Sequence, residues 1–296
     1  MGAPQCARCG LEVVPEKSQQ AHRTCLEPRH HRQIATLGMD TALTAQKTSV
    51  KYHRPLQNIG RCRIREFSVA GHNLTLNLGS SLEPRACKIE AAIIAGWTGR
   101  DPLAVEKHIK ELKALGVREP TATPIFYRVA ASRLTTERQI EASGTDSGGE
   151  VEFVLLRQGG ELWVGVGSDH TDRKVEAYGV TVSKQMCEKP IAPQFWAYDE
   201  VVGHWDELIL RSFVFEDGQN ALYQEGPVTA MLHPQTLISR YTGGGGLNES
   251  TLMFCGTLPV NGGVRPTDYF AFEIEDPVLG RKITHEYRVV TLPVLG

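Results

Sequence analysis

Residues 150–173, EVEFVLLRQGGELWVGVGSDHTDR, decide how this chain is expected to fold. Apolar residues cluster over 150–157 and again over 161–166, a pattern typical of strands. The segment between them, Gln158–Gly160, predicts a tight hairpin, because consecutive glycines adopt the positive φ angles of such turns. We therefore expect an antiparallel pair of strands with acidic residues at its open end.

Strands outnumber helices in the rest of the chain. Asp101 and Pro102 predict the start of a helix over about 102–115, because aspartate caps helices and proline suits the first helical position. A shorter helix is predicted over 234–241. With no βαβ rhythm and no internal repeat, the pattern indicates a β-rich α+β domain over 61–296. Further strands are predicted over 62–70, 73–78, 87–95, 125–130, 175–183, 208–215, 251–255, 269–274 and 285–292.

Composition excludes several classes of protein. The 296 residues are 41% hydrophobic and 22% charged, which is ordinary globular usage. A formal net charge of −2 gives no reason to expect nucleic acid or an acidic membrane as a partner. Seven cysteines, an odd number, are unlike a secreted disulfide framework, and no apolar run is long enough to span a membrane. We expect a cytoplasmic enzyme.

The first 60 residues differ from the rest. They hold eight Lys+Arg against four Asp+Glu, a charge of +4, which leaves −6 for the remainder. Periodic apolar residues are sparse there, so we predict a basic, poorly structured extension over 1–60. A zinc site formed by Cys6, Cys9, His22 and Cys25 is one hypothesis, because the spacing suits a tetrahedral zinc knuckle. The alternatives are a disordered leader, or sequence upstream of a true start for which Met39 is a candidate.

Acidic residues form the first candidate site. Glu150 and Glu152 share one face of the predicted strand, because side chains alternate with period two. Asp169 follows the partner strand, so it can fold back beside them. Three carboxylates with room for water and substrate suit a hard cation such as Mg²⁺ or Mn²⁺. The alternative is a solvated strand face beside a polar turn.

His108 and Glu111 lie at i and i+3 on the predicted helix and are therefore neighbours on its surface. A carboxylate beside an imidazole orients the ring and raises its basicity, which suits a general base near neutral pH. A surface ion pair is the alternative interpretation.

Taken together, these motifs resemble the fumarylacetoacetate hydrolase superfamily, and specifically an uncharacterised bacterial branch of it. The resemblance covers about 90–292. The branch is marked by Ala95–Asp101 and by the helix around His108. The motifs follow the superfamily's order: His108-x-x-Glu111, Phe126-Tyr127-Arg128, Glu150-Val151-Glu152, Asp169-His170-Thr171-Asp172-Arg173, Lys184 before Pro190–Pro193, Cys255-Gly256-Thr257-Leu258-Pro259, and Gly263–Asp268 before Phe270–Ile274.

The resemblance implies a mixed β-roll or sandwich with few helices, a homodimer, and a role for each motif. Glu150, Glu152 and Asp169 would bind the metal ion. His108 and Glu111 would activate water, Lys184 would stabilise negative charge, and Arg128, Arg173 and Thr257 would bind substrate. Arg128 stands where the superfamily usually has lysine. Three departures concern the substrate more than the metal: the gap from Glu152 to Asp169 is shorter than usual, Lys184 lies one residue off the expected spacing and leaves Lys189 as an alternative, and Leu258 interrupts a Gly-Thr-Pro turn.

The implied function is a metal-dependent hydrolase that cleaves a carbon–carbon bond in a β-diketone or acylpyruvate-like acid through a metal-bound enolate. Its partner would be a small dicarbonyl or keto-acid substrate. Enolate chemistry serves β-keto acid decarboxylation or tautomerisation equally well. A third reading is a non-catalytic binding protein that keeps the fold.

Overall fold

The predicted hairpin forms the centre of the larger sheet. In the computed structural model its strands are β8 (Val151–Gln158) and β9 (Glu161–Ser168). Gly159 and Gly160 between them have φ of 67° and 80°, as a two-residue hairpin turn requires. The structure describes residues 71–80, 83–114 and 119–295. The predicted extension, its zinc ligands and the strand predicted over 62–70 lie outside these residues.

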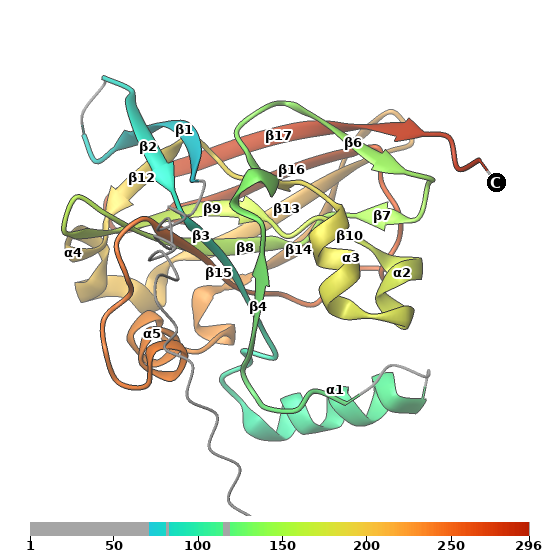
Figure 1. Ribbon diagram of the computed structural model, residues 1–296, viewed down its shortest axis with the longest axis horizontal. Coiled ribbons are helices and arrows are strands. Elements are labelled where there is room, and N and C mark those ends of the chain that lie inside the picture. The colour runs from blue at the N-terminus through green and yellow to red at the C-terminus, as the bar shows by residue number, and fades with distance from the viewer. Residues whose placement is uncertain (1–70, 81–82, 115–118, 296) are drawn as a thin grey trace, which may run out of the picture. The chain divides into compact units, whose positions relative to one another are not determined.

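The described residues form two large sheets and two small ones (Figure 1). The larger sheet has the order β2-β1-β12-β9-β8-β15-β3-β4, and the smaller has the order β14-β13-β16-β17-β6. Their remaining strands are β1 (His72–Leu78), β2 (Arg85–Ile89), β3 (Ala91–Gly96), β4 (Ile125–Val129), β12 (Gln194–Ala197), β15 (Thr251–Thr257), β6 (Gln139–Ser143), β13 (Ile209–Glu216), β14 (Gln219–Pro227), β16 (Tyr269–Asp276) and β17 (Arg281–Leu292).

Short strands and helices complete the described part of the chain. Two small pairs join β10 to β7 and β11 to β5. The elements are β5 (Leu134–Thr135), β7 (Ser147–Gly148), β10 (Thr171–Asp172), β11 (Lys189–Pro190), α1 (Pro102–Ala114), α2 (Arg173–Tyr178), α3 (Val180–Met186), α4 (Tyr198–Val201) and α5 (Pro234–Thr242), with 3₁₀ turns at Ala131–Arg133, Val202–Glu207 and Val228–Ala230.

Two hydrophobic cores cover opposite faces of the larger sheet. Val151, Phe153 and Leu155 face the first core, which the second sheet covers with residues such as Phe270. Val154 and Leu156, on the other face of β8, point into the second core, to which β1, β2, β3 and β12 contribute. A strand covered on both faces is apolar almost throughout, and this explains the continuous hydrophobic run in β8. The β-rich α+β class is confirmed.

Most predicted elements are confirmed, but the strand over 175–183 is wrong. That segment forms α2 and α3. The Asp172 carboxylate accepts a hydrogen bond from Val175 N at 2.8 Å, and this N-cap starts a helix where alternating apolar residues indicated a strand. The predicted strand 87–95 is two strands, β2 and β3, separated at Glu90. Asp101 caps α1 as expected, accepting from Leu103 N at 2.9 Å.

None of the helices among the described residues combines the length and apolar character needed to cross a bilayer.

Truncation of the central strand tests this packing. Phe153 is fully buried, whereas Phe215 in β13 is 53% exposed. We expect Phe153→Ala to lower the free energy of unfolding by about 3–5 kcal/mol, because it removes buried surface and leaves a cavity. The matched change Phe215→Ala should cost no more than about 1 kcal/mol. Urea denaturation measures both, and equal losses would show that β8 is not central to the core.

Candidate metal centre

Three carboxylates converge where β8 begins and β9 ends. Glu150, Glu152 and Asp169 each offer an oxygen, and these oxygens lie within 4.8 Å of one another. Glu152 and Asp169 are buried, and the Glu150 side chain is 17% exposed. The hairpin creates this geometry, because Asp169 N donates to Glu150 O at 2.9 Å and so returns the end of β9 to the start of β8.

Glu152 is held by the end of β15. Its Oε2 accepts a hydrogen bond from Gly256 N at 2.6 Å. Gly256 has φ of 98°, and a Cβ built there would lie 1.7 Å from Thr98 Oγ1, so only glycine fits. The glycine of the Cys255-Gly256-Thr257 motif thus brings a backbone donor to a buried carboxylate.

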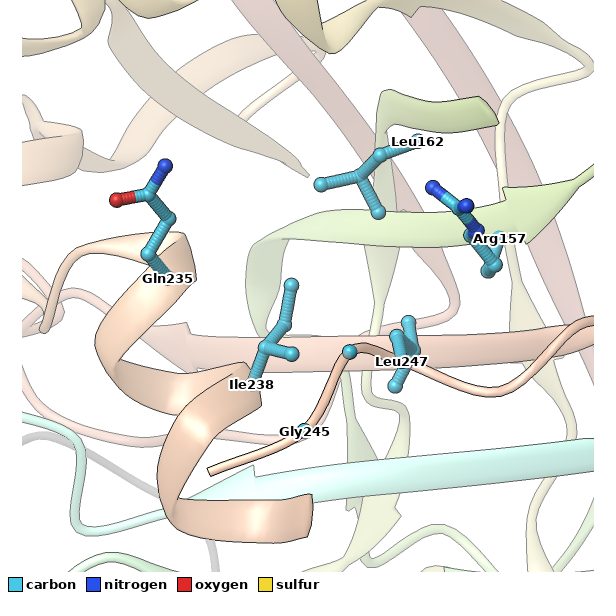
Figure 2. Close-up of a pocket in the computed structure, with 7 residues that line it drawn as sticks. Arg157, Leu162, Gln235, Ile238, Gly245 and Leu247 are labelled. Atoms are coloured by element: carbon cyan, nitrogen blue, oxygen red, sulfur yellow. The ribbon is translucent and has the colours of Figure 1, made fainter. Parts of the chain in front are cut away.

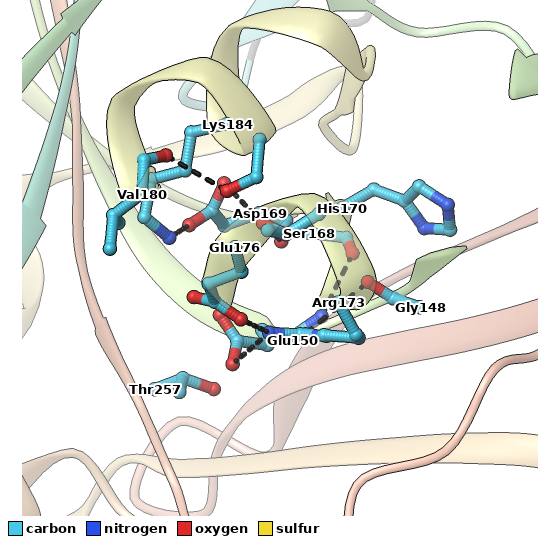
Figure 3. A network of polar contacts seen from close by, with 12 residues as sticks. Gly148, Glu150, Ser168, Asp169, His170, Arg173, Glu176, Val180, Lys184 and Thr257 are labelled. Atoms are coloured by element: carbon cyan, nitrogen blue, oxygen red, sulfur yellow. Dashed lines mark hydrogen bonds and ion pairs between the residues drawn. The ribbon is translucent and has the colours of Figure 1, made fainter. Parts of the chain in front are cut away.

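Two lysines neutralise Asp169. Its Oδ2 accepts a hydrogen bond from Lys184 of α3 (Figure 3). Its Oδ1 lies 3.1 Å from Lys189 Nζ of β11. Lys189 also donates to the carbonyl of His170. The motif spacing left Lys184 and Lys189 as alternatives for one position in the site, and the structure places both beside the same carboxylate.

An arginine and a fourth carboxylate flank the triad. Arg173 Nη1 lies 3.0 Å from Glu150 Oε1 and 3.2 Å from Glu176 Oε2 (Figure 3). Its Nη2 donates to Gly148 O at 3.4 Å. Both terminal nitrogens of Arg173 therefore contact the protein, and the side chain orients Glu150 from the first turn of α2.

Gln224 of β14 joins the second sheet to the site. This fully buried side chain accepts from Val151 N at 3.0 Å and donates to Thr257 Oγ1 at 2.8 Å. Thr257 Oγ1 in turn donates to Val151 O at 2.8 Å. Both backbone groups of the residue between Glu150 and Glu152 are thus fixed by side chains.

The pKa values of Glu152 and Asp169 are shifted in opposite directions. Burial raises the pKa of Glu152 well above its ordinary range, and the negative charge of Asp169 adds to this. Burial also opposes ionisation of Asp169, but Lys184 and Lys189 outweigh it and lower the Asp169 pKa to about 2. Although burial opposes its charge, Lys184 has a raised pKa because the neighbouring carboxylates hold it protonated. Glu152 is therefore harder to ionise than Asp169.

Other predicted site residues lie elsewhere or are used differently. Arg128 projects from the face of β4 opposite Tyr127 and donates to Glu90 O at 2.6 Å. Tyr127 shares the core face of Val154, and its ring centroid lies 6.0 Å from Lys184 Nζ. Tyr127 rather than Arg128 therefore stands beside the lysine of the site.

Three further predicted site residues are Thr257, His108 and Glu111. The hydroxyl proton of Thr257 is already donated to Val151 O, so this side chain positions the strand that carries the glutamates. His108 and Glu111 lie on α1, and the structure describes their backbone but not their side chains. Their proposed role stays a prediction.

Comparison with known proteins places the chain in a family. A family model for proteins of unknown function, DUF2848, matches residues 95–287, which is more than half of the chain. The chain belongs to this family. A search of curated proteins found no match for this DUF2848 member.

Solved structures share the fold. The yeast protein ynq8, a fumarylacetoacetate hydrolase family protein, matches with a TM-score of 0.50 and 17% identity, over 70% of this chain and 95% of that one. A 2-keto-3-deoxy-D-arabinonate dehydratase complexed with magnesium and 2,5-dioxopentanoate matches with a TM-score of 0.50 and 15% identity, over 72% and 78% of the two chains. The fold implied by the sequence resemblance is therefore confirmed for this DUF2848 protein.

Sequence reasoning missed Tyr127, Glu176 and Gln224. Tyr127 could be found only by knowing which face of β4 meets the site. Glu176 lies in a segment predicted as a strand, and Asp172 as a helix N-cap is the signal that would have placed it one turn from Arg173. Gln224 carries no local signal, because its partners come from other strands.

Replacement of Glu152 tests the charge balance. Glu152 binds its proton more tightly in the folded state, so the stability that its protonated form supplies is lost as the pH rises through the raised pKa. In metal-free protein we therefore expect Glu152→Gln to raise the melting temperature at neutral pH, with the gain shrinking as the pH falls. Thermal unfolding with a chelator present measures this. The exposed Glu161→Gln serves as control, and a Glu152→Gln protein less stable than wild type would contradict the charge assignment.

Proposed function

We propose that this DUF2848 protein is a divalent-metal-dependent hydrolase that cleaves a carbon–carbon bond in a β-diketone or acylpyruvate-like acid. The observation that carries the proposal is the convergence of Glu150, Glu152 and Asp169 beside a protonated Lys184. The dehydratase of the same fold, complexed with magnesium and 2,5-dioxopentanoate, supports a cation and a dicarbonyl acid as ligands of this fold.

The donor set fits a hard divalent cation. Carboxylate oxygens are the ligands that Mg²⁺ and Mn²⁺ prefer, and three lie close enough together to share one ion. Burial and the negative charge of Asp169 raise the pKa of Glu152, so its ionised form is disfavoured, and a bound cation would stabilise that form. Mg²⁺ or Mn²⁺ held by these residues would act as a Lewis acid toward the oxygens of a dicarbonyl substrate.

Within this proposal the side chains have separate tasks. Lys184 is held charged at the buried Asp169, so its ammonium protons can stabilise negative charge that develops on a substrate oxygen. Glu111 would orient His108, which would take a proton from the water that attacks the carbonyl carbon. Carbon–carbon cleavage would then release a carboxylic acid and an enolate, which takes up a proton to become the ketone.

Binding of the metal ion is the first test. We expect Glu150→Ala to lower the affinity for Mn²⁺ at least about 100-fold, because one carboxylate of three is lost. Glu176→Ala is a matched control, since Glu176 contacts the same Arg173 but is outside the triad. Isothermal titration calorimetry measures both variants. Wild-type protein that binds neither Mn²⁺ nor Mg²⁺ would reject the enzymatic proposal and favour a non-catalytic binding protein.

The second test separates hydrolysis from decarboxylation or tautomerisation. We expect His108→Ala to keep its Mn²⁺ affinity but to lose at least about 100-fold in the turnover of an acylpyruvate, because water activation is removed. Chromatography of the acid and ketone products, with calorimetry for the metal, measures both properties. Neither reaction of the alternative proposal needs an activated water. Full turnover by His108→Ala would therefore contradict hydrolysis and favour that alternative.

A further inference from the structure

A hollow lies at the opposite end of β8 from the acidic triad. Its volume is about 320 Å³, and it is bounded by the tip of the β8–β9 hairpin, by α5 and by the glycine run after α5 (Figure 2). Arg157 is five residues beyond Glu152, which separates the two by about 16 Å along the strand. The two side chains also point to opposite faces of the sheet, so one small ligand cannot contact both.

The floor of the hollow is apolar and its edges are polar. Leu162, Ile238 and Leu247 form the floor, and Ile238 and Leu247 are only 8% and 6% exposed. Leu162 pairs directly with Arg157 across the hairpin, so both side chains stand on the same face. Figure 2 shows Arg157 and Gln235 on opposite sides of these apolar side chains.

Arg157 has no acidic partner within the part of the chain that the structure describes. Glu249 lies at the tip of the hairpin but does not pair with Arg157. Its carboxylate accepts hydrogen bonds from the backbone N–H groups of Gly159 and Gly160. A half-buried guanidinium beside apolar side chains, without a carboxylate partner among the described residues, is a ready anchor for an anion.

Hydrogen bonds hold the walls of the hollow in place. Thr242 Oγ1 donates to Gly245 O at 2.7 Å and fixes the glycine run against the end of α5. Ser250 N donates to Arg157 O at 2.8 Å and joins the following segment to β8. The hollow is therefore formed before a ligand arrives, as most small-molecule sites are.

We propose that this hollow binds a small monocarboxylate with a short apolar chain. The guanidinium of Arg157 receives the carboxylate in a bidentate pair, and the chain covers Leu162, Ile238 and Leu247. The volume lies at the low end of the range for ligand sites, which favours a small acid over a peptide carboxylate. The proposal does not depend on the reaction at the acidic triad.

Hexanoate is a suitable probe, and the methyl groups of the floor report its binding directly. In the full-length protein with methyl-labelled Ile, Leu and Val, we expect hexanoate to cause saturable shifts at Leu162, Ile238 and Leu247. The methyl signals of Val151, beside the triad, should not move. Arg157→Gln should weaken hexanoate at least about tenfold, and neutral hexanamide should bind wild-type protein at least about tenfold more weakly, because each removes the charge pair.

The exposed arginine of β2, Arg85→Gln, is a matched control that should keep wild-type affinity. Glu150→Ala should also leave hexanoate binding unchanged, which separates this site from the proposed metal centre. The proposal is overturned by an absence of saturable shifts at the three floor residues, by equal binding of hexanoate and hexanamide, or by unchanged affinity in Arg157→Gln. Shifts confined to Val151 would place the acid at the triad and equally reject it.

Discussion

Electrostatic balance at Asp169 is the constraint on which the rest of the site depends. Three carboxylates with oxygens within 4.8 Å of one another repel, and two of them are buried where repulsion is weakly screened. Lys184 and Lys189 offset the charge of Asp169 from two different elements, α3 and β11. Burial of so many charges costs stability unless each is paired.

Groups on paired strands hold the two glutamates of the triad in place. Gly256 N fixes Glu152, while Gln224 and Thr257 fix the peptide groups of Val151 between the two glutamates. These donors and acceptors come from β14 and β15, so both sheets must be assembled before the carboxylates converge. A site built on paired strands keeps its geometry better than one carried by surface loops.

Sequence patterns predict the elements that neighbouring residues determine. They fail for features that depend on pairing with strands distant in the sequence. The hairpin at Gly159 and Gly160 and the helix after Asp101 are encoded locally, so both are confirmed. The order of the motifs also brought Glu150, Glu152 and Asp169 together correctly. Arg128 was expected to bind substrate because of its place in the motif order, but the face of β4 on which it lies follows from pairing with β3, which no local pattern shows. Alternating apolar residues over 175–183 indicated a strand, whereas the Asp172 cap and packing beside the site made two helices.

The position of the charged groups on β8 follows from its two buried faces. Val151 to Leu156 are covered by one core or the other, apart from Glu152, so a charged side chain in the middle of the strand would lose its hydration without a partner. Charge is therefore confined to the two ends, where a backbone donor, a lysine or solvent can reach it. Glu152 lies at one end on the face of the second core, and Arg157 lies at the other end on the face of the first. The same burial that makes β8 the centre of the fold thus determines that its charged side chains lie only near where the strand begins and where it ends.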